Sequence, residues 1–198
     1  MSETDGQAAS LLSLAHLLPK PTAYVFGGGG SWGALHWGSL RAQEQTDIRP
    51  DLVVGTSVGS LNGAIAAADP EHSAEILGRL WPPVTREQIF PGNVLTGLNT
   101  LRRTHGWLYD NANLAEYLTS RLPVTRIEDL HVPFVAVATD FATGSRVELD
   151  HGDLASALLA SSAIPGIFPW VDREGLRLVG GGRSSGPSHH RTIFRFML

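Results

Sequence analysis

Ser57 stands in a pattern that is typical of a catalytic nucleophile. The segment GTSVG at residues 55–59 matches G-x-S-x-G, and it lies between an apolar run (Leu52 to Val54) and an alanine-rich run (Val58 to Ala68). When a strand precedes this motif and a helix follows it, a sharp turn exposes the serine hydroxyl at the edge of the sheet. The start of the helix also favours a negative charge that develops beside the serine. We therefore interpret Ser57 as the nucleophile of an acyl-transfer reaction.

A second glycine cluster, GGGGSWG at residues 27–33, also separates an apolar run from a helix-compatible one. Residues 28–33 fit G-x-G-x-x-G, so the cluster could bind a dinucleotide pyrophosphate, donate backbone N–H groups to an oxyanion, or form a tight turn alone. A dinucleotide-binding fold places an acidic residue at the end of its second strand. Here Asp51 lies at the start of that strand, and the Ser57 motif occupies its end. The two clusters together favour the oxyanion interpretation.

Apolar β-rich runs alternate with helix-compatible runs, and this alternation predicts the fold. The three clearest strands are apolar throughout, which is typical of strands buried on both faces. The pattern predicts an α/β fold in which helices cover a mostly parallel sheet. We expect strands at Thr22–Phe26, Asp51–Val54 and Phe134–Ala138, a hairpin partner at Ser145–Leu149, a loop at Pro82–Thr104, and helices at Gly33–Gln45, Val58–Ala68, Glu71–Trp81, Asn113–Leu122 (capped by Asp110 or Asn111) and Asp153–Ser161.

The length and composition are those of one globular domain. The chain has 198 residues, 42% of them hydrophobic and 17% charged, which excludes the disordered class. Its 15 basic and 19 acidic side chains give a net charge of −4, so we expect no nucleic-acid partner. The absence of cysteine excludes a disulfide framework and a thiolate metal site. No targeting segment is visible, and we expect a cytoplasmic protein without metal or cofactor.

Four segments carry a resemblance to a known family. They are FGGGGSWGALHWGSL, PDLVVGTSVGSLNGA, FVAVATDFATG and ASSAIPGIFPWV. In this order and spacing they resemble the patatin-like phospholipase family over about residues 21–182. The resemblance implies a three-layer α/β/α fold with a mostly parallel central sheet, and hydrolysis of lipid acyl esters by a Ser–Asp dyad. It also implies that Ser57 is the nucleophile, that Gly28, Gly29 and Gly30 form the oxyanion loop, and that the N–H of Val58 assists them.

The sequence departs from the family's pattern at two positions. Many members carry a basic residue where this chain has Trp32. The dyad aspartate normally stands in a D-G-G or D-G-A motif shortly after the SSAIPG-like segment, but the corresponding residues here read LVGGG at 178–182. Gly180 would then occupy the position of the aspartate, and glycine cannot accept a proton.

The end of the chain follows no helix or strand period. Residues 183–198 read RSSGPSHHRTIFRFML, and we interpret them as an irregular tail left by a frameshift or truncation near Gly180. On this interpretation residues 21–182 form an incomplete patatin-like domain, preceded by an N-terminal arm at residues 1–20.

Other residues could replace the missing base. Asp140, Asp150, Asp153 and Asp172 are available, and Asp140 follows the third strand, although an aspartate before FATG is also a common turn residue. The pair His189 and His190 lies late in the chain, as the order of a Ser–His triad requires. Adjacent histidines in an irregular tail are more typical of solvent-exposed positions.

These observations predict a serine acyl hydrolase that acts on phospholipid or acylglycerol esters and is impaired by the loss of its base. Its partners would be a lipid ester substrate and, through peripheral contact, a membrane surface. The alternatives are a non-catalytic lipid-binding or interaction protein on the same scaffold, and a nucleotide-binding domain of the Rossmann type.

Overall fold

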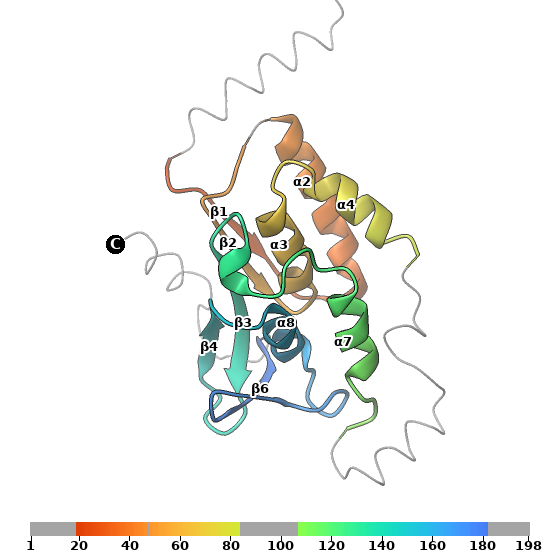
Figure 1. Ribbon diagram of the computed structural model, residues 1–198, viewed down its shortest axis with the longest axis vertical. Helices are drawn as coiled ribbons and strands as arrows, with labels where there is room; N and C mark the ends of the chain where they lie inside the picture. The colour runs from red at the N-terminus through yellow and green to blue at the C-terminus, as the bar shows by residue number, and fades with distance from the viewer. Residues whose placement is uncertain (1–18, 47, 84–106, 182–198) are drawn as a thin grey trace, which may run out of the picture.

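The computed structural model describes residues 19–46, 48–83 and 107–181, and the strands in these ranges form one mixed sheet (Figure 1). The strand order is β1-β2-β3-β6-β5, with β4 paired to β3. Neighbouring strands among β1, β2 and β3 are parallel, whereas β4 and β6 run antiparallel to β3 and β5 runs antiparallel to β6. The strands are β1 (Ala23–Phe26), β2 (Leu52–Thr56), β3 (Phe134–Asp140), β4 (Arg146–Leu149), β5 (Val171–Arg173) and β6 (Leu176–Gly180).

The observed helices lie where the sequence predicts them, and their ends differ by a few residues. The Asp110 carboxylate accepts a hydrogen bond of 2.7 Å from the Ala112 N–H, so of the two candidate caps it is Asp110 that supplies the side-chain contact to α7. Asp153 caps α8 through the N–H of Ser156 at 2.6 Å. The helices are α2 (Ala34–Gln45), α3 (Val58–Ala68), α4 (Ser73–Leu80), α7 (Ala112–Thr119) and α8 (Leu154–Ser162), with 3-10 turns η1 (Gly30–Gly33) and η2 (Ile127–Asp129).

Three of the predicted segments fall outside the described part of the chain. Nearly all of the expected loop at Pro82–Thr104 lies there, as do most of the N-terminal arm and the whole tail at residues 183–198. The hairpin strands β5 and β6 are elements that the sequence pattern did not predict.

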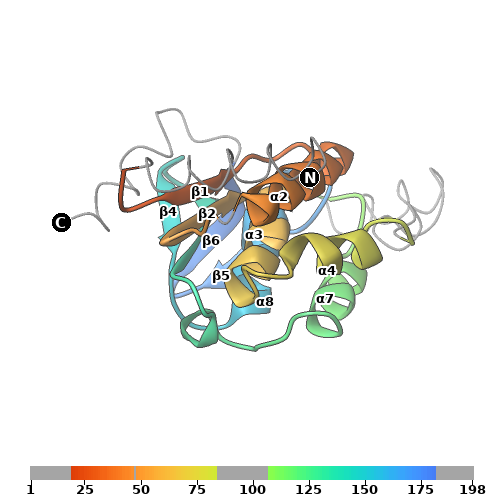
Figure 2. The ribbon, with the colours of Figure 1, turned by 90° about the horizontal axis from the view of Figure 1, so that it is seen from above.

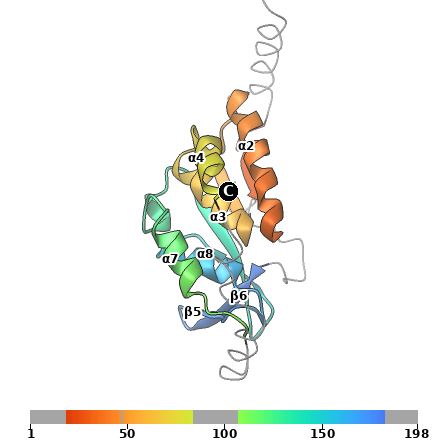
Figure 3. The same ribbon diagram turned by 90° about the vertical axis from the view of Figure 1, so that its right-hand side faces the viewer.

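The helices that the structure describes pack on one face of the sheet (Figure 2). Because β1, β2 and β3 follow one another in sequence and in space, right-handed crossovers place the connecting helices on the same side. The main core lies there and includes Phe26, Val53 and Ala136 from the strands together with Leu40 of α2 and Leu158 of α8. At the other end of this layer α7 packs on α8 (Figure 3).

The second face of the sheet carries a smaller apolar cluster. Leu52, Val54, Val135 and Val137 form it, with Ala23 packed against them, and these four side chains are buried. Strands with apolar side chains on both faces require cover on both faces. The mixed, mostly parallel open sheet with flanking helices agrees with a three-layer α/β/α fold of the patatin-like class.

The strands β2 and β6 lie end to end along one side of β3. Residues 136–137 of β3 pair with β4 and also with β2, and residues 138–139 pair with β4 and also with β6. A strand has only two hydrogen-bonding sides, so β2 and β6 share the side that β4 does not occupy. The last residue of β2 and the last residue of β6 therefore come together at the middle of the sheet.

The first turn of α3 approaches the ends of β1 and β2 more closely than any side chain would allow. A Cβ atom on Gly59 would lie 2.2 Å from the carbonyl oxygen of Phe26, and one on Gly55 would lie 2.5 Å from the carbonyl oxygen of Gly59. Both distances are far below van der Waals contact and both involve backbone atoms. The two glycines of the G-x-S-x-G motif are therefore packing requirements.

This close approach leads to a stability prediction with a matched control. Gly59→Ala should lower the free energy of unfolding by about 3 kcal/mol, because the added methyl group forces α3 away from β1. Gly38→Ala, on the exposed face of α2 where a Cβ meets nothing within 4 Å, should instead raise it by about 0.5–1 kcal/mol. Urea unfolding of the three proteins measures both effects, and equal stability of the two variants would contradict the packing account.

Candidate active site

The backbone of Ser57 has a conformation that is rare for a residue other than glycine. It lies at the turn between β2 and α3 with φ 54° and ψ −129°. Such strained residues persist only where the surrounding structure holds them. The Ser57 N–H donates to the Ser161 Oγ at 2.9 Å, and that hydroxyl donates in turn to the carbonyl of Val137 at 2.7 Å. Ser161 on α8 thereby ties the turn to β3, which the sequence pattern did not reveal.

The glycine loop after β1 lies directly against Ser57. A Cβ atom on Gly28 would be 3.3 Å from the Cβ of Ser57, so the loop and the serine are in contact. Gly29 and Gly30 have φ values of 143° and 58°, in the region that favours glycine. Gly30 begins η1 and Val58 begins α3, and the first N–H groups of a helix have no partner within it. The structure thus brings together Ser57 and all the residues expected to bind an oxyanion.

Asn62 connects the glycine loop to α3. Its Nδ2 donates to the carbonyl of Gly33 at 2.9 Å and lies 3.0 Å from His36 Nδ1, while its Oδ1 accepts from Trp81 Nε1 at 3.1 Å. Burial lowers the pKa of His36, which favours the neutral ring and lets its Nδ1 accept the Asn62 proton. This network fixes the first turn of α2 relative to the serine turn. In the sequence, the only sign of this hydrogen-bond network was an asparagine within an alanine-rich helix.

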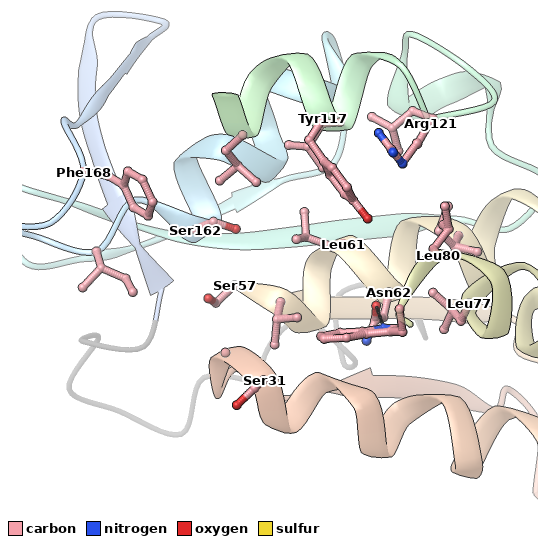
Figure 4. Close-up of a pocket in the computed structure, with 18 residues that line it drawn as sticks. Ser31, Ser57, Leu61, Asn62, Leu77, Leu80, Tyr117, Arg121, Ser162 and Phe168 are labelled. Atoms are coloured by element: carbon pink, nitrogen blue, oxygen red, sulfur yellow. Dashed lines mark hydrogen bonds between the residues drawn. The ribbon is translucent and has the colours of Figure 1, made fainter. Parts of the chain in front are cut away.

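A largely apolar cavity of about 490 Å³ opens beside Ser57 (Figure 4). It extends along α3 from Ser57 to Ile65, which corresponds to about 12 Å at 1.5 Å per residue. Ser57, Ser162 and Phe168 lie at one end, and Leu77, Leu80 and Arg121 at the other. Volume and lining suit a hydrocarbon chain whose polar end lies at Ser57. The remaining lining residues are Gly30, Ser31, Val58, Leu61, Asn62, Ile65, Trp81, Leu114, Tyr117, Leu118, Leu122 and Ile164.

Gly180 lies beside the point where Ser57 leaves the sheet. Thr56 pairs with Val137 of β3, and Gly180 pairs with the next residue, Ala138, on the same side. The Gly180 N–H donates to the carbonyl of Ala163 at 2.7 Å. Gly180 therefore lies next in register to the last residue of β2, and it carries no side chain.

Comparison with known proteins now places the chain in a family. The sequence model of a family described as patatin-like phospholipase matches residues 24–190. The chain belongs to the patatin-like phospholipase family. The matched residues include the serine turn, the glycine loop and all of the described sheet except Ala23.

Several curated relatives share this domain. Human patatin-like phospholipase domain-containing protein 6 is 32% identical over 182 residues, which cover 85% of this chain and 12% of that protein. A lysophospholipase of Mycosarcoma maydis is 30% identical over 168 residues, which cover 80% of this chain and 8% of that protein. A patatin-like protein of Caenorhabditis elegans is 30% identical over 163 residues, covering 80% of this chain and 12% of its own length. The chain thus spans about an eighth or less of these relatives.

The neighbour of Gly180 supports its alignment with the patatin-like D-G motif. A Cβ atom on Gly181 would lie 2.3 Å from the carbonyl oxygen of Val137, so only glycine fits there. A Cβ on Gly180 would lie 3.3 Å and 3.4 Å from the carbonyl oxygens of Ser161 and Ala163, which small shifts can accommodate. Position 181 therefore requires glycine, whereas a side chain at position 180 requires its backbone neighbours to shift by a few tenths of an ångström.

Three of the other carboxylates that the sequence offered have partners elsewhere. Asp140 accepts from the Ala142 N–H at 3.2 Å and from the Thr143 hydroxyl at 2.6 Å, so it organises the turn after β3. Asp153 caps α8, and Asp150 lies 2.7 Å from the ring of His151. Asp172 lies on the edge strand β5. The histidine pair at 189–190 lies outside the described residues.

The turn at Asp140 predicts a pH-dependent stability. The hydroxyl of Thr143 and the N–H of Ala142 hold the pKa of Asp140 below its ordinary value. A lowered folded-state pKa contributes stability above the unfolded-state pKa, and this contribution is lost as the pH falls through the folded-state pKa. The free energy of unfolding of the natural chain should therefore exceed that of Asp140→Asn by the largest amount at pH 7, and this difference should shrink below about pH 4. Urea unfolding of both proteins between pH 7 and pH 3 measures the difference, and a constant difference would contradict the assignment.

Proposed function

We propose that this chain is a serine acyl hydrolase for lipid esters, with Ser57 as its nucleophile. The observation that supports this most directly is the strained Ser57 turn, held against the glycine loop at one end of an apolar cavity. The Ser57 N–H already binds Ser161, so the backbone N–H groups of Gly28, Gly29, Gly30 and Val58 are the donors for an oxyanion. Acyl transfer requires this arrangement of nucleophile, donors and acyl-chain site.

The reaction would begin when Ser57 Oγ attacks the ester carbonyl. The carbonyl oxygen becomes an oxyanion, and the N-termini of η1 and α3 stabilise its charge. The Ser57 proton must move to a base as the bond forms. In the family's dyad an aspartate takes it, but Gly180 stands at that position here. We therefore propose that turnover is impaired, with a residual rate from the oxyanion donors and substrate binding alone.

The substrate class we propose is a phospholipid or acylglycerol ester that enters from a membrane surface. Trp32, Leu35 and Ile164 have exposed fractions of 68%, 64% and 43%, and Ile164 also lines the cavity. Trp32 and Leu35 lie on η1 and α2, directly after the glycine loop. These residues offer an apolar rim for peripheral contact by a cytoplasmic protein. The helices in the described ranges are all too short or too polar to cross a bilayer.

The lack of a carboxylate at position 180, beside an intact apolar cavity, favours a second function on the same scaffold. If this lack abolishes turnover altogether, the cavity would still bind lipid. The alternative is therefore a non-catalytic lipid-binding or interaction protein.

Restoring the carboxylate distinguishes the two functions. Gly180→Asp should raise the rate of hydrolysis of a p-nitrophenyl acyl ester by about 10²–10⁴-fold, because general-base catalysis contributes on that scale. Gly180→Asn is the matched control, since it adds a side chain of the same size without a base, and it should leave the rate unchanged. Hydrolysis rates measured for the three proteins give the comparison.

The nucleophile is tested in the restored protein. Ser57→Ala in the Gly180→Asp background should abolish the gained activity. Equal rates in the Asp and Asn variants would overturn the assignment of position 180, and full activity without the Ser57 hydroxyl would overturn the nucleophile. Lipid binding by all variants with no hydrolysis in any of them would favour the non-catalytic alternative.

A further inference from the structure

A second serine at the reactive end of the cavity has no function in the chemistry described above. Ser162 is the last residue of α8, it is 7% exposed, and it lines the cavity together with Ser57. Its Oγ is buried and has no hydrogen-bond partner among the residues that the structure describes. Buried hydroxyl groups are normally paired, so this one requires an explanation.

The neighbouring serine differs from Ser162 because its hydroxyl has two partners. Ser161 faces the sheet, where it both accepts from Ser57 and donates to Val137. Ser162 is one position further along the helix, so its side chain points in a different direction. Figure 4 shows the Ser162 hydroxyl at the cavity, above Ser57 and beside Leu61.

The other polar side chains of the cavity are engaged, exposed or, in the case of Tyr117, only half-buried. Both donors of the Asn62 amide and its oxygen have partners. Arg121 stacks 4.1 Å from the Tyr117 ring centroid and donates to Ser120 at 3.0 Å, at the end of the cavity far from Ser57. Ser31 is exposed. Among the lining residues that the structure describes, Ser162 is therefore the buried polar side chain without a partner.

We propose that the Ser162 hydroxyl contacts the bound lipid and donates a hydrogen bond to an oxygen of its ester group. This inference rests on the proposed function of the same cavity. An ester offers only acceptors, and the Ser162 hydroxyl supplies the donor that the apolar walls lack. Rotation about χ1 moves the oxygen between staggered positions without disturbing the helix. Pairing with the ester removes the penalty of an unsatisfied buried hydroxyl, so the site distinguishes an ester from a hydrocarbon of the same shape.

The test compares two ligands that differ in one acceptor. Methyl dodecanoate carries the ester carbonyl, and dodecyl methyl ether lacks it. Without a base at position 180, the natural chain allows equilibrium titration of the ester, followed by tryptophan fluorescence from Trp81 in the cavity wall. The ratio of the two dissociation constants measures recognition of the ester. Ser162→Ala should reduce this preference for the ester by roughly three- to tenfold, the effect of one net hydrogen bond.

Three controls separate contact with the ligand from a structural effect. Ser156→Ala removes a hydroxyl from the same helix away from the cavity and should leave the preference unchanged. Ser162→Ala should melt at the same temperature as the natural chain or higher, since it removes an unpaired buried group. Ser161→Ala should melt at a lower temperature, since it breaks two hydrogen bonds.

The outcomes decide between the claims independently of turnover. An ester preference that is unchanged in Ser162→Ala would overturn the inference, and so would failure of the natural chain to bind either ligand. A reduced preference supports it even if Gly180→Asp never hydrolyses an ester, because this assay requires binding alone. Failure of hydrolysis and failure of ester recognition are therefore separate results.

Discussion

The contact between the first turn of α3 and the ends of β1 and β2 is the constraint on which the rest of the site depends. Gly59 lets the helix approach within a distance at which a methyl group would overlap the Phe26 carbonyl. This approach brings the glycine loop, which follows β1, against the serine turn, which follows β2. The strained backbone of Ser57 is then held by Ser161 and its bond to β3. The proposed nucleophile and the proposed oxyanion donors are therefore positioned by backbone packing and by Ser161, without a carboxylate.

This independence explains how the site could keep its geometry while lacking a base. The hydrogen bonds of Ser57, Ser161 and Asn62 run between α3, α8, β3 and the first turn of α2. None of them involves the side chain at position 180. The backbone of Gly180 still completes the sheet through Ala138 and binds Ala163. On the proposed assignment, the lack of a carboxylate at position 180 removes one chemical step and leaves the cavity and the serine turn in place.

The sequence predicted the elements whose signals are local. Apolar runs ended by glycine predicted β1, β2 and the turn at Ser57, and Asp110 was one of two caps predicted for α7, whereas the cap of α8 by Asp153 was not predicted. The strand β5 was missed because three residues with a mixed pattern carry too little periodicity. The hydrogen bonds of Ser161 and Asn62 were also missed, because they join residues up to 104 positions apart, and no spacing rule reports such contacts. Gly180 was singled out only through the family resemblance. The pairing of Gly180 with Ala138 then placed it next in register to the end of β2.

The central claim is that Ser57 belongs to a site that is complete except for its base. Covalent labelling by an alkyl fluorophosphonate tests it most directly, because the serine oxygen displaces fluoride from phosphorus and the labelled residue can be identified by mass spectrometry. The account predicts that the label is found on Ser57, slowly in the natural chain and in Gly180→Asn, and at least about 10²-fold faster in Gly180→Asp. A label on another residue, or equal rates with aspartate and asparagine at position 180, would contradict it.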